Sequence, residues 1–593
     1  MADDNVNINE EESLEKAYDS KLMMRLLQYA RPYWKLFAVA AIMLLASTAA
    51  DLLRPYLLQI AIDDCIAKGD TARLSRIGIL FISTIILGFI FNFIQIYTLT
   101  HTGQTIIYNL RQQIFTHLQK MSIAFFDKNP VGRLVTRVTN DTETLNDMYT
   151  NVLVSLLKDI SILLGTVIIM FKMNVRLSLV VLLAVPVLIP MTMIFRAKVR
   201  SIYREVRVAL ARINSILSEN ITGIRIIQIF NREKEKLDEF EKANNDYKKA
   251  LIKEVIVSGV FRPSIDMLSG FLLAIIIWYA GGKVIDNAIT FGVLYAFINY
   301  IGYFFQPVND LAEKYNILQS AMASSERIFS ILDTETETDS GTVCTDKKLF
   351  KGSIEFKNVW FAYKNEDWVL RNVSFSVPSG QTVAIVGATG AGKTSIINLI
   401  NRFYEIQKGE ILIDGIKTTD IQKECLRKNT GVVLQDVFLF GGTIKGNIKL
   451  NEDSITDDDI KTAAEYVNAG RFIESLPNKY EEEVMERGAT FSSGQRQLLA
   501  FARTLAFDPS ILILDEATAN IDTETELLIQ DALSKLTRDR TTIVIAHRLS
   551  TIQHADNIIV LHKGKIRETG THQELLAKKG MYYNLYQLQY NNM

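Results

Sequence analysis

Cysteine is scarce in this 593-residue chain, and neither sign of charge is in excess. The three cysteines, Cys65, Cys344 and Cys425, are odd in number and form no CxxC pair, which argues against a disulfide scaffold and against a zinc site. The 65 Lys and Arg residues balance 66 Asp and Glu residues, so the chain presents no overall basic field to a polyanion. We therefore expect no nucleic-acid partner.

A secretory signal is also missing, because the first twenty residues are acidic and contain no apolar core. We expect the amino terminus to stay in the cytoplasm. The segment that follows, residues 22–36, mixes apolar side chains with Arg25, Arg31 and Lys35. This composition is typical of a helix that lies on a membrane surface, although an ordinary helix end has a similar composition.

Long apolar runs are abundant before about residue 315. Three runs carry no charge, and three more qualify as spans when a charged residue is allowed within or beside them. At about 1.5 Å per residue, such runs can cross a hydrocarbon core of about 30 Å as helices. The six predicted spans are residues 36–50 with a continuation past Asp51, 77–100, 160–171 with an extension back through Asp159, 177–195, 267–282 and 288–309.

The segments between the spans alternate in length, and the long ones are charged. Residues 100–147 and 196–253 are helical in pattern, and the second segment carries 14 Lys and Arg residues. The excess of positive charge on cytoplasmic loops places these segments, and with them both termini, in the cytoplasm. Since the chain leaves and re-enters the bilayer as helices, we expect the spanning helices to extend well beyond it.

Charged residues also occur within or beside the predicted spans. Charge at membrane depth is costly, so these side chains are expected either to face a water-filled substrate path or to pair with one another. They are Asp51, Arg54, Lys158, Asp159, Arg262 and Asp266. Polar and aromatic residues of the last span are open to two interpretations, cavity lining or packing. They are Tyr295, Asn299, Tyr300, Tyr303, Phe304 and Gln306.

A polar stretch after about residue 331 is typical of a linker, and alternating, β-branched segments after residue 352 predict strands. One predicted strand ends in a full GxxxxGK[ST] motif that is followed by an apolar helix. In this context the glycines let backbone N–H groups surround a phosphate, while the lysine neutralises charge and the threonine hydroxyl reaches Mg²⁺. The predicted phosphate site consists of Gly387, Ala388, Thr389, Gly390, Ala391, Gly392, Lys393, Thr394 and the following Ser395.

A second apolar strand, residues 511–514, leads into two carboxylates, Asp515 and Glu516. Asp515 would hold Mg²⁺, and Glu516 would polarise the water that attacks the γ-phosphate. Many buried strands end in Asp, so this strand alone is weak evidence. Together with the phosphate loop it indicates a hydrolase.

Residues 491–497, FSSGQRQ, resemble the LSGGQ signature of ATP-binding cassette (ABC) proteins. Other landmarks of that family occur before and after this segment, in the order that the family has them. Tyr363 resembles the aromatic residue that stacks on adenine, and Gln435 resembles the glutamine of the Q-loop. Asp522 resembles the D-loop aspartate and His547 the switch histidine. The resemblance implies ATP and Mg²⁺ as cofactors. It assigns the metal to Thr394, Gln435 and Asp515, and hydrolysis to Glu516, His547 and Gln435.

The membrane half is similar to exporters of this family, which join six spanning helices to one cassette. Residues 125–141 and 219–235 resemble their two intracellular loops, whose coupling helices rest on the cassettes. The expected fold is a six-helix α-helical transmembrane domain followed by an α/β P-loop nucleotide-binding domain. The expected boundaries are an N-terminal segment with its interfacial helix over 1–33, the transmembrane domain over 34–325, a linker over 326–350 and the nucleotide-binding domain over 351–593.

The signature segment carries half of an anion site. Ser492 is a good N-cap for a helix through Phe501, and the N-terminus of that helix attracts a phosphate without a lysine of its own. The family arrangement implies two cassettes packed head to tail, with each ATP between the phosphate loop of one chain and the signature of the other, here Ser492, Ser493, Gly494 and Gln495. The expected partner is therefore a second ABC half-transporter chain.

Ser493 stands where the family signature has its first glycine, and it adds a Cβ where the backbone approaches the γ-phosphate. The chain's own Walker residues are intact. This combination resembles the catalytically complete half of a bacterial heterodimeric exporter; a homodimer that tolerates serine is the alternative.

The resemblance implies an ABC-type ATPase and translocase of the cytoplasmic (inner) membrane, with its N-terminus and nucleotide-binding domain in the cytoplasm. We expect efflux of amphipathic or hydrophobic small molecules by alternating access, with membrane lipids as the surroundings. A lipid flippase has the same spans and motifs. An ATP-gated channel or regulatory subunit is less favoured, because a pure switch does not require Glu516 and His547.

Overall fold

The structure of the chain is a computed structural model that describes residues 20–286, 288–344, 350–515, 523–545 and 552–590. The fold divides into two units. The first, here called the helical unit, contains the residues up to Gln119 and Pro130–Thr334. The second, here called the sheet unit, contains Lys120–Asn129 and the residues from Glu335 onwards. The helical membrane domain followed by an α/β domain, as predicted, is confirmed.

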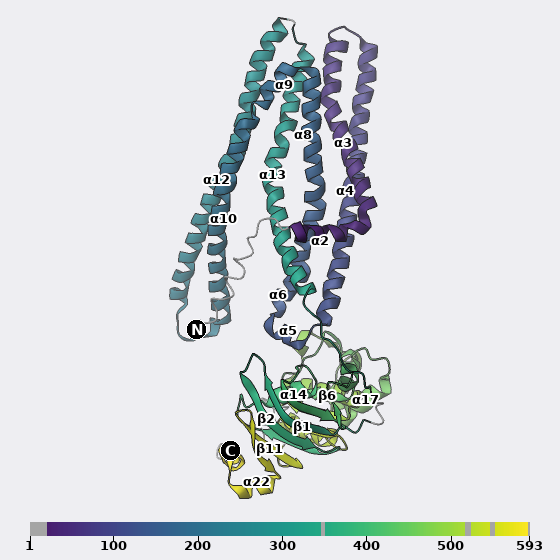
Figure 1. Ribbon diagram of the computed structural model, residues 1–593, viewed down its shortest axis with the longest axis vertical. Coiled ribbons are helices and arrows are strands. Elements are labelled where there is room, and N and C mark those ends of the chain that lie inside the picture. Colours follow the sequence, from purple (N-terminus) through teal and green to yellow (C-terminus); the bar gives the residue numbers. More distant parts are fainter. Residues whose placement is uncertain (1–19, 287, 345–349, 516–522, 546–551, 591–593) are drawn as a thin grey trace. The chain divides into compact units, whose positions relative to one another are not determined.

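The helical unit is built from long helices (Figure 1). Among the described residues, five helical segments are long and apolar enough to cross a membrane: Ser20–Ile66, Thr71–Gln119, Val131–Met173, Val175–Phe195 and Glu233–Ile285. A further long helix, α13, packs on α3, α8 and α12. Asn299, Gln306 and several tyrosines make its apolar half less hydrophobic than the other spans. The long helices are α3 (Trp34–Ile60), α4 (Thr71–Gln119), α8 (Leu153–Met173), α9 (Val175–Leu182), α10 (Val185–Thr222), α12 (Glu233–Ile285) and α13 (Phe291–Leu332).

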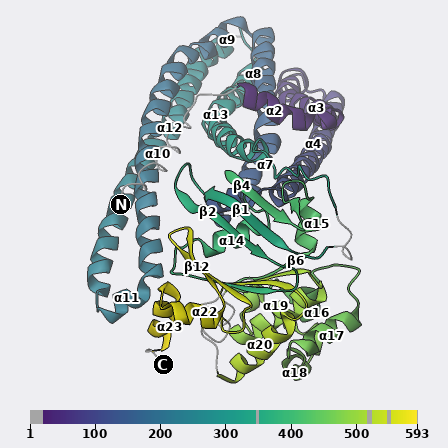
Figure 2. The same ribbon diagram turned by 60° about the horizontal axis from the view of Figure 1, so that its bottom comes forward.

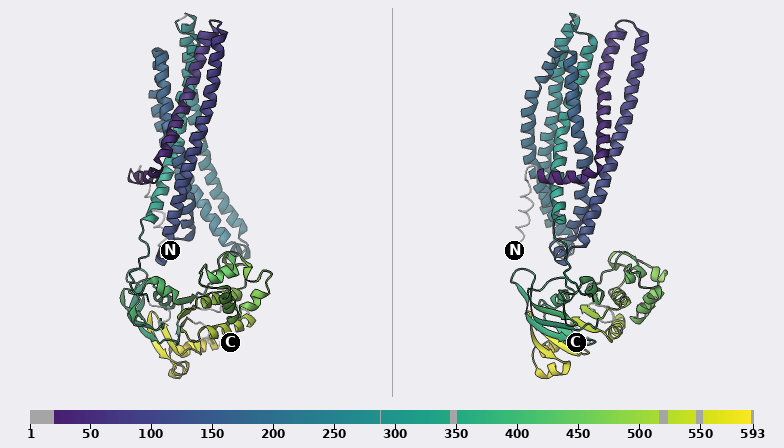
Figure 3. Two further views of the ribbon diagram at one scale, coloured as in Figure 1. Left: turned by 90° about the vertical axis from the view of Figure 1, so that its right-hand side faces the viewer. Right: turned by 45° about the vertical axis from the view of Figure 1, so that its right-hand side comes forward.

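Several of these helices are much longer than a bilayer requires. The 53 residues of α12 correspond to about 80 Å of helix, so the prediction that the spans extend beyond the membrane is confirmed. The helices α10 and α12 pack on each other and are joined by α11 (Ile224–Ile229). Figures 1 and 3 show the connected ends of α10 and α12 standing apart from the other long helices.

The segment before the first span forms its own short helix, α2 (Ser20–Ala30), which lies across the long helices (Figure 3). A 3₁₀ turn, Arg31–Tyr33, separates it from α3, so this helix ends earlier than the predicted range of 22–36. The backbone carbonyl of Leu26 accepts a hydrogen bond of 2.7 Å from the Tyr149 hydroxyl. Arg25 forms an ion pair of 2.7 Å with Asp333 of the unit's last segment. These contacts fix α2 to the bundle.

Ion pairs account for three of the charged residues at the predicted spans, Asp51, Arg54 and Asp159. Arg54 lies 3.0 Å from Asp51 on the same helix, and Asp159 pairs with Lys314 rather than with its neighbour Lys158. The side chain of Arg262 lies outside the described residues. Packing likewise accounts for Tyr300, which is fully buried and donates its hydroxyl to the Leu52 carbonyl at 2.7 Å, and for the buried Phe304.

A buried carboxylate ties the long segment between α4 and α8 to the end of α13. Asp141 accepts hydrogen bonds from the Ser324 hydroxyl at 3.0 Å, from Arg327 Nε at 3.1 Å and from Arg137 Nη1 at 2.8 Å. A buried charge is tolerated when it is paired and hydrogen-bonded in this way. The segment before α8 and the end of the last long helix are thus held together.

The sheet unit contains two larger sheets. The first is antiparallel, in the order β2-β1-β4-β5, and the second has the order β12-β11-β3-β10-β9-β6 with only β12 antiparallel to its neighbour. A further pair is β7 (Gly442–Thr443) with β8 (Glu483–Val484). The strands are β1 (Ile354–Ala362), β2 (Trp368–Val377), β3 (Thr382–Val386), β4 (Lys408–Ile413), β5 (Ile416–Lys417), β6 (Thr430–Val433), β9 (Ile511–Asp515), β10 (Thr541–Ile545), β11 (Asn557–His562) and β12 (Lys565–Gly570).

Two apolar cores fill this unit. One lies between the antiparallel sheet, one face of the parallel sheet and α14, and the other lies between the opposite face of the parallel sheet and the remaining helices. Figure 2 shows α16, α17 and α19 gathered on the β6 side, where α19 packs on β6. The helices are α5 (Ile123–Lys128), α14 (Lys393–Ile400), α15 (Lys423–Lys428), α16 (Ile444–Lys449), α17 (Asp457–Tyr466), α18 (Gly470–Glu474), α19 (Ser493–Ala506), α20 (Thr523–Leu536), α22 (His572–Lys578) and α23 (Met581–Tyr590).

The predicted linker begins inside a helix, because α13 continues to Leu332. The next residues run along α15 and are held there by charge. Glu337 accepts from Lys423 Nζ at 3.1 Å and from Arg427 Nη2 at 2.7 Å, and the Glu337 N–H donates to the Lys120 carbonyl at 2.8 Å. We call Glu337, Lys423 and Arg427 the linker clamp.

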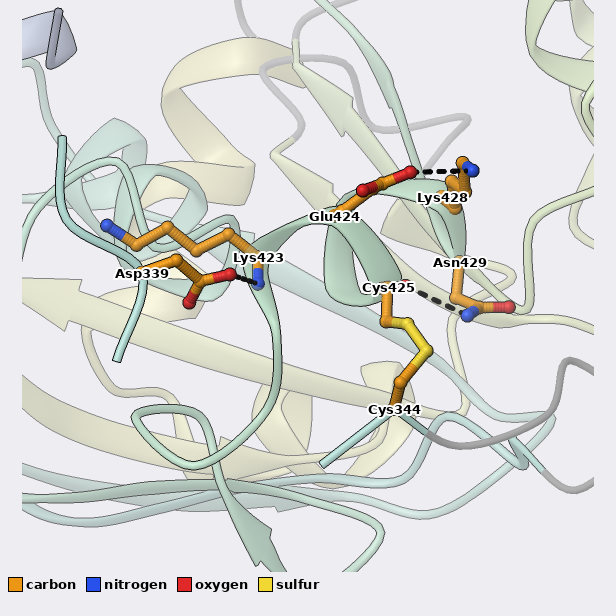
Figure 4. The surroundings of a disulfide bond; sticks show 7 residues. All are labelled: Asp339, Cys344, Lys423, Glu424, Cys425, Lys428 and Asn429. Carbon is orange, nitrogen blue, oxygen red and sulfur yellow. Dashed lines mark hydrogen bonds and ion pairs between the residues drawn. A yellow bond between two sulfur atoms is a disulfide. The ribbon is translucent and has the colours of Figure 1, made fainter. Parts of the chain in front are cut away.

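A disulfide bond joins Cys344 to Cys425 (Figure 4). Cysteine number and spacing argued against a disulfide scaffold, and they gave no indication of this single bond. The two residues are 81 positions apart in sequence, with their Cα atoms 5.7 Å apart. A parallel bridge between Val343 and Ile421 brings the linker beside the start of α15, and sequence spacing gives no sign of this long-range pairing. The third cysteine, Cys65, is buried and free.

We expect Glu337→Gln to destabilise the linker clamp by about 2 kcal/mol at neutral pH, because the buried Lys423 would lose its charged partner. Burial opposes ionisation of Glu337, but hydrogen bonds from Arg427 and Lys423 outweigh it and lower its pKa below 4.5. A carboxyl group whose pKa is lower in the folded than in the unfolded state stabilises the fold at any pH above its unfolded-state pKa. This stabilisation is lost as the pH falls through the folded-state pKa.

Thermal unfolding of the full chain, followed across pH, should show the stabilities of variant and wild type converging below pH 4.5. Glu424→Gln, at an exposed pair with Lys428, is the control. A constant difference between Glu337→Gln and wild type at all pH values would contradict the assignment.

Candidate nucleotide-binding site

The predicted phosphate loop connects β3 to α14, and three of its glycines are required by the backbone. Gly390 and Gly392 have φ values of +79° and +102°, in the left-handed region. A Cβ on Gly392 would lie 2.7 Å from Leu370 Cδ2, and one on Gly387 would lie 2.2 Å from the Leu561 carbonyl oxygen. In contrast, a Cβ on Gly390 would meet nothing within 4 Å. The loop is thus closely packed at its base and open where it curves.

The lysine of the motif points its ammonium group back over this loop. Lys393 is buried at the first position of α14, and its Nζ donates to the Gly387 carbonyl at 2.7 Å and approaches the Ala388 carbonyl at 3.4 Å. Thr394, the next residue, is exposed. A curved glycine loop, a helix N-terminus, an ammonium group and an exposed hydroxyl are the groups that bind nucleotide phosphates and their Mg²⁺. The residues present therefore fit that ligand.

Strand order brings the other predicted site residues to the same edge of the sheet. The strand β10 lies between β3 and β9, and β6 follows β9, all parallel, so their carboxyl ends share one edge. In this register Ile385, Ile545 and Asp515 are aligned. Two strand spacings, about 10 Å, separate the strand of the phosphate loop from that of Asp515. Asp515 is buried, and Gln435 follows β6 and is exposed. Ligands of parallel α/β sheets bind at this edge.

Three predicted residues, Glu516, Asp522 and His547, lie outside the described residues. Glu516 directly follows the last residue of β9, and His547 comes two positions after the end of β10. The structure describes the strands that lead to them and nothing of the residues themselves.

The signature segment forms the start of α19. Ser492 is the N-cap, as predicted: its hydroxyl accepts from the Gln495 N–H at 3.2 Å, and Gln495 Oε1 accepts from the Ser492 N–H at 3.0 Å. The helix continues to Ala506, beyond the predicted end at Phe501. Ser493 is its first residue and Gly494 is buried in its first turn. The helix packs on β6, α16, α17 and α20.

Tyr363 lies directly after β1, beside the helix that follows the phosphate loop. Its hydroxyl is 3.1 Å from the Ser395 hydroxyl and accepts from Asn398 Nδ2 at 3.2 Å. The residue is 42% exposed, so an aromatic surface is accessible next to the phosphate loop. Sequence reasoning missed Gln407, whose side chain bonds to both backbone groups of Ala362, at 3.0 and 2.9 Å, and so fixes the residue before Tyr363. A contact across 45 residues leaves no signal in a single sequence.

Comparison with known proteins agrees with this geometry. The family model for the ABC transporter transmembrane region matches residues 37–308, and that for ABC transporter matches residues 370–519. An uncharacterized ABC transporter ATP-binding protein of Bacillus subtilis, YknV, is 39% identical over 98% of this chain and 96% of its own length. A probable multidrug resistance ABC transporter ATP-binding/permease protein of the same organism, YheH, is 41% identical over 84% of this chain and 74% of its own length. An ATP-dependent lipid A-core flippase of Syntrophus aciditrophicus is 35% identical over 96% of this chain and 94% of its own length. The chain therefore belongs to the ABC transporter family, as a membrane protein whose transmembrane region is followed by an ATP-hydrolysing ABC domain.

Proposed function

We propose that this chain is one half of a dimeric exporter that uses hydrolysis of Mg²⁺-bound ATP to move amphipathic or hydrophobic small molecules out across the cytoplasmic membrane. The observation that carries the proposal is the shared edge of the parallel sheet, where the phosphate loop and Gln435 follow β3 and β6 and where β9 ends at Asp515. It occurs in a chain whose other unit has helices long enough to span a bilayer. The N-terminus and the sheet unit lie in the cytoplasm, where ATP is available.

The residues of the site divide the work between binding and hydrolysis. Loop residues from Gly387 to Ser395 hold the phosphates, and Lys393 neutralises their charge. Tyr363 stacks on adenine. When bound, Mg²⁺ stabilises charge on the β- and γ-phosphates, and Thr394, Gln435 and Asp515 hold it. Glu516 polarises the attacking water, assisted by His547 and Gln435, and Asp522 contributes from the D-loop.

A second chain completes the site in this proposal. The N-terminus of the 14-residue helix α19, with Ser492, Ser493, Gly494 and Gln495, attracts the γ-phosphate of nucleotide held by the partner's loop. Exposed apolar side chains around α11 support contact with a partner: Ile226, Ile229 and Phe230 are 64%, 74% and 68% exposed. Such a group on a connecting segment outside the membrane is typical of an interaction surface.

Ser493 favours a heterodimer in which the partner supplies an intact signature. We expect the purified chain alone to hydrolyse ATP slowly, and to gain at least about tenfold when assembled with a related half that has LSGGQ but lacks the catalytic glutamate, since the correct signature stabilises transition-state charge. Steady-state ATPase assays of the single chain and of the co-purified pair test this. High, drug-stimulated activity in the isolated homodimer would rule the heterodimer out.

Lipid flipping is a second candidate, favoured by the 35% identity to a lipid A-core flippase over nearly the whole chain. Reconstituted vesicles distinguish the two activities. Export predicts ATP-dependent accumulation of an amphipathic dye, whereas flipping predicts ATP-dependent protection of a fluorescent phospholipid from a membrane-impermeant quencher.

A further inference from the structure

An aromatic cluster joins the ring of Tyr363 to a residue that follows α14. The Tyr404 ring meets the Tyr363 ring edge to face, with the centroids 4.9 Å apart and the planes at 89°. Phe361, which is buried, packs edge-on against both rings, at 4.7 Å from Tyr363 and 5.8 Å from Tyr404. Edge-to-face contacts of this kind are directional and contribute beyond the area that they bury. The orientation of the Tyr363 ring therefore depends on that of Tyr404.

The backbone on both sides of this contact is fixed. The Gln407 N–H donates to the Trp360 carbonyl at 3.2 Å, and the Gln407 side chain bonds to both backbone groups of Ala362. The segment that carries Tyr404 is therefore held to the end of β1, and a change at the Tyr404 side chain is not absorbed by movement of the chain.

The hydroxyl of Tyr404 has a different partner, the Asp127 carboxylate of α5. This short helix comes from the first long loop, far away in sequence, yet it belongs to the sheet unit. The hydroxyl is protonated at physiological pH and donates to the carboxylate, and burial and the neighbouring Asp127 carboxylate raise the pKa of Tyr404 further above its ordinary value. One tyrosine thus contacts the predicted adenine-stacking ring with its own ring and α5 with its hydroxyl.

We propose that Tyr404 is a positioning residue through which α5 and the adenine-binding ring of Tyr363 influence each other. The inference rests on the proposed role of Tyr363. If the contact between Tyr404 and Asp127 raises the affinity for nucleotide by some factor, then bound nucleotide must strengthen that contact by the same factor, because coupling between two sites is reciprocal. The arrangement therefore links nucleotide binding to the segment that leads into the spanning helices.

A double-mutant cycle on the full chain in lipid nanodiscs tests the inference, with Mg²⁺–ADP as the probe because it is not hydrolysed. We expect Asp127→Ala and Tyr404→Phe each to raise the Kd for Mg²⁺–ADP about threefold, since each removes one hydrogen bond that orients the ring. Because both changes remove the same hydrogen bond, the Kd of the double variant should also rise about threefold rather than ninefold. Asp127→Asn keeps an acceptor oxygen, so its Kd for Mg²⁺–ADP should stay within about 1.5-fold of the wild-type value. Lys128→Ala, at the next residue of α5, is the matched control.

Pyrophosphate, which occupies the phosphate loop but has no base, separates positioning from general damage. Its affinity should be unchanged in every variant. Multiplicative effects in the double variant, an unchanged Kd in both single variants, or equal weakening of pyrophosphate binding would each overturn the inference while leaving the nucleotide site in place. Failure of the wild-type chain to bind either probe would instead overturn the proposed nucleotide site, and this inference with it.

Discussion

Lys393→Ala is expected to lower ATP turnover of the assembled transporter by at least about 100-fold, because a preorganised positive charge at the transferring phosphate is removed. The wild-type ammonium is buried and held over the loop by the Gly387 carbonyl, so it needs little rearrangement to meet an incoming phosphate. The variant leaves the loop glycines and α14 in place. We therefore expect a folded chain that binds Mg²⁺–ATP more weakly and hydrolyses it poorly.

Steady-state ATPase assays and equilibrium binding of Mg²⁺–ATP measure this effect. Lys461→Ala, at an exposed lysine of α17, is a matched control. Its ATPase rate and its affinity for Mg²⁺–ATP should stay within about twofold of the wild-type values, as is usual for surface substitutions. Turnover of Lys393→Ala within tenfold of wild type would contradict the assignment of this lysine to the phosphate site.

Glu516→Gln is expected to lower turnover by about 1000-fold while the affinity for Mg²⁺–ATP stays within about twofold, since an amide of equal size cannot accept the proton of the attacking water. Glu516 itself lies outside the described residues, and the expectation rests on its position directly after Asp515, the buried last residue of β9. The two variants differ in kind. Lys393→Ala changes binding and hydrolysis together, whereas Glu516→Gln changes hydrolysis alone.

The Glu516 prediction is checked by measuring ATPase rate and nucleotide affinity on the same preparation. Glu465→Gln, at an exposed residue of α17, is the control. Wild-type turnover in Glu516→Gln would remove this residue as the base. Loss of nucleotide affinity without loss of rate at saturating ATP would move it from hydrolysis to binding.

Local sequence was sufficient wherever a few consecutive residues carry the chemistry. The phosphate loop could be predicted because its glycines, lysine and threonine are adjacent, and the φ values of Gly390 and Gly392 show why glycine is needed there. The N-cap at Ser492 was equally local, since the capping box closes within four residues. Apolar runs predicted the spans for the same reason, because a hydrocarbon core sets a minimum length for each of them separately.

Contacts between distant segments could not be predicted in this way. The disulfide joins residues 81 positions apart, and cysteine number and spacing give no sign of it. The bond between Tyr404 and Asp127 crosses 277 positions. Similarly, α2 is fixed to the bundle because Leu26 and Arg25 meet Tyr149 and Asp333, which lie far along the chain. None of these pairings has a spacing rule that a single sequence could reveal.

The amino-acid sequence by itself determined that the chain has membrane-spanning helices followed by a nucleotide phosphate loop, because helix length and loop curvature are properties of neighbouring residues. The tertiary structure alone decided which distant groups meet. It set the strand order that puts β10 between the phosphate loop and Asp515, and it placed α5 in the same unit as Tyr404. The physical reason is that side-chain packing and strand pairing are chosen over the whole chain at once, by burial and hydrogen bonding, rather than by sequence distance.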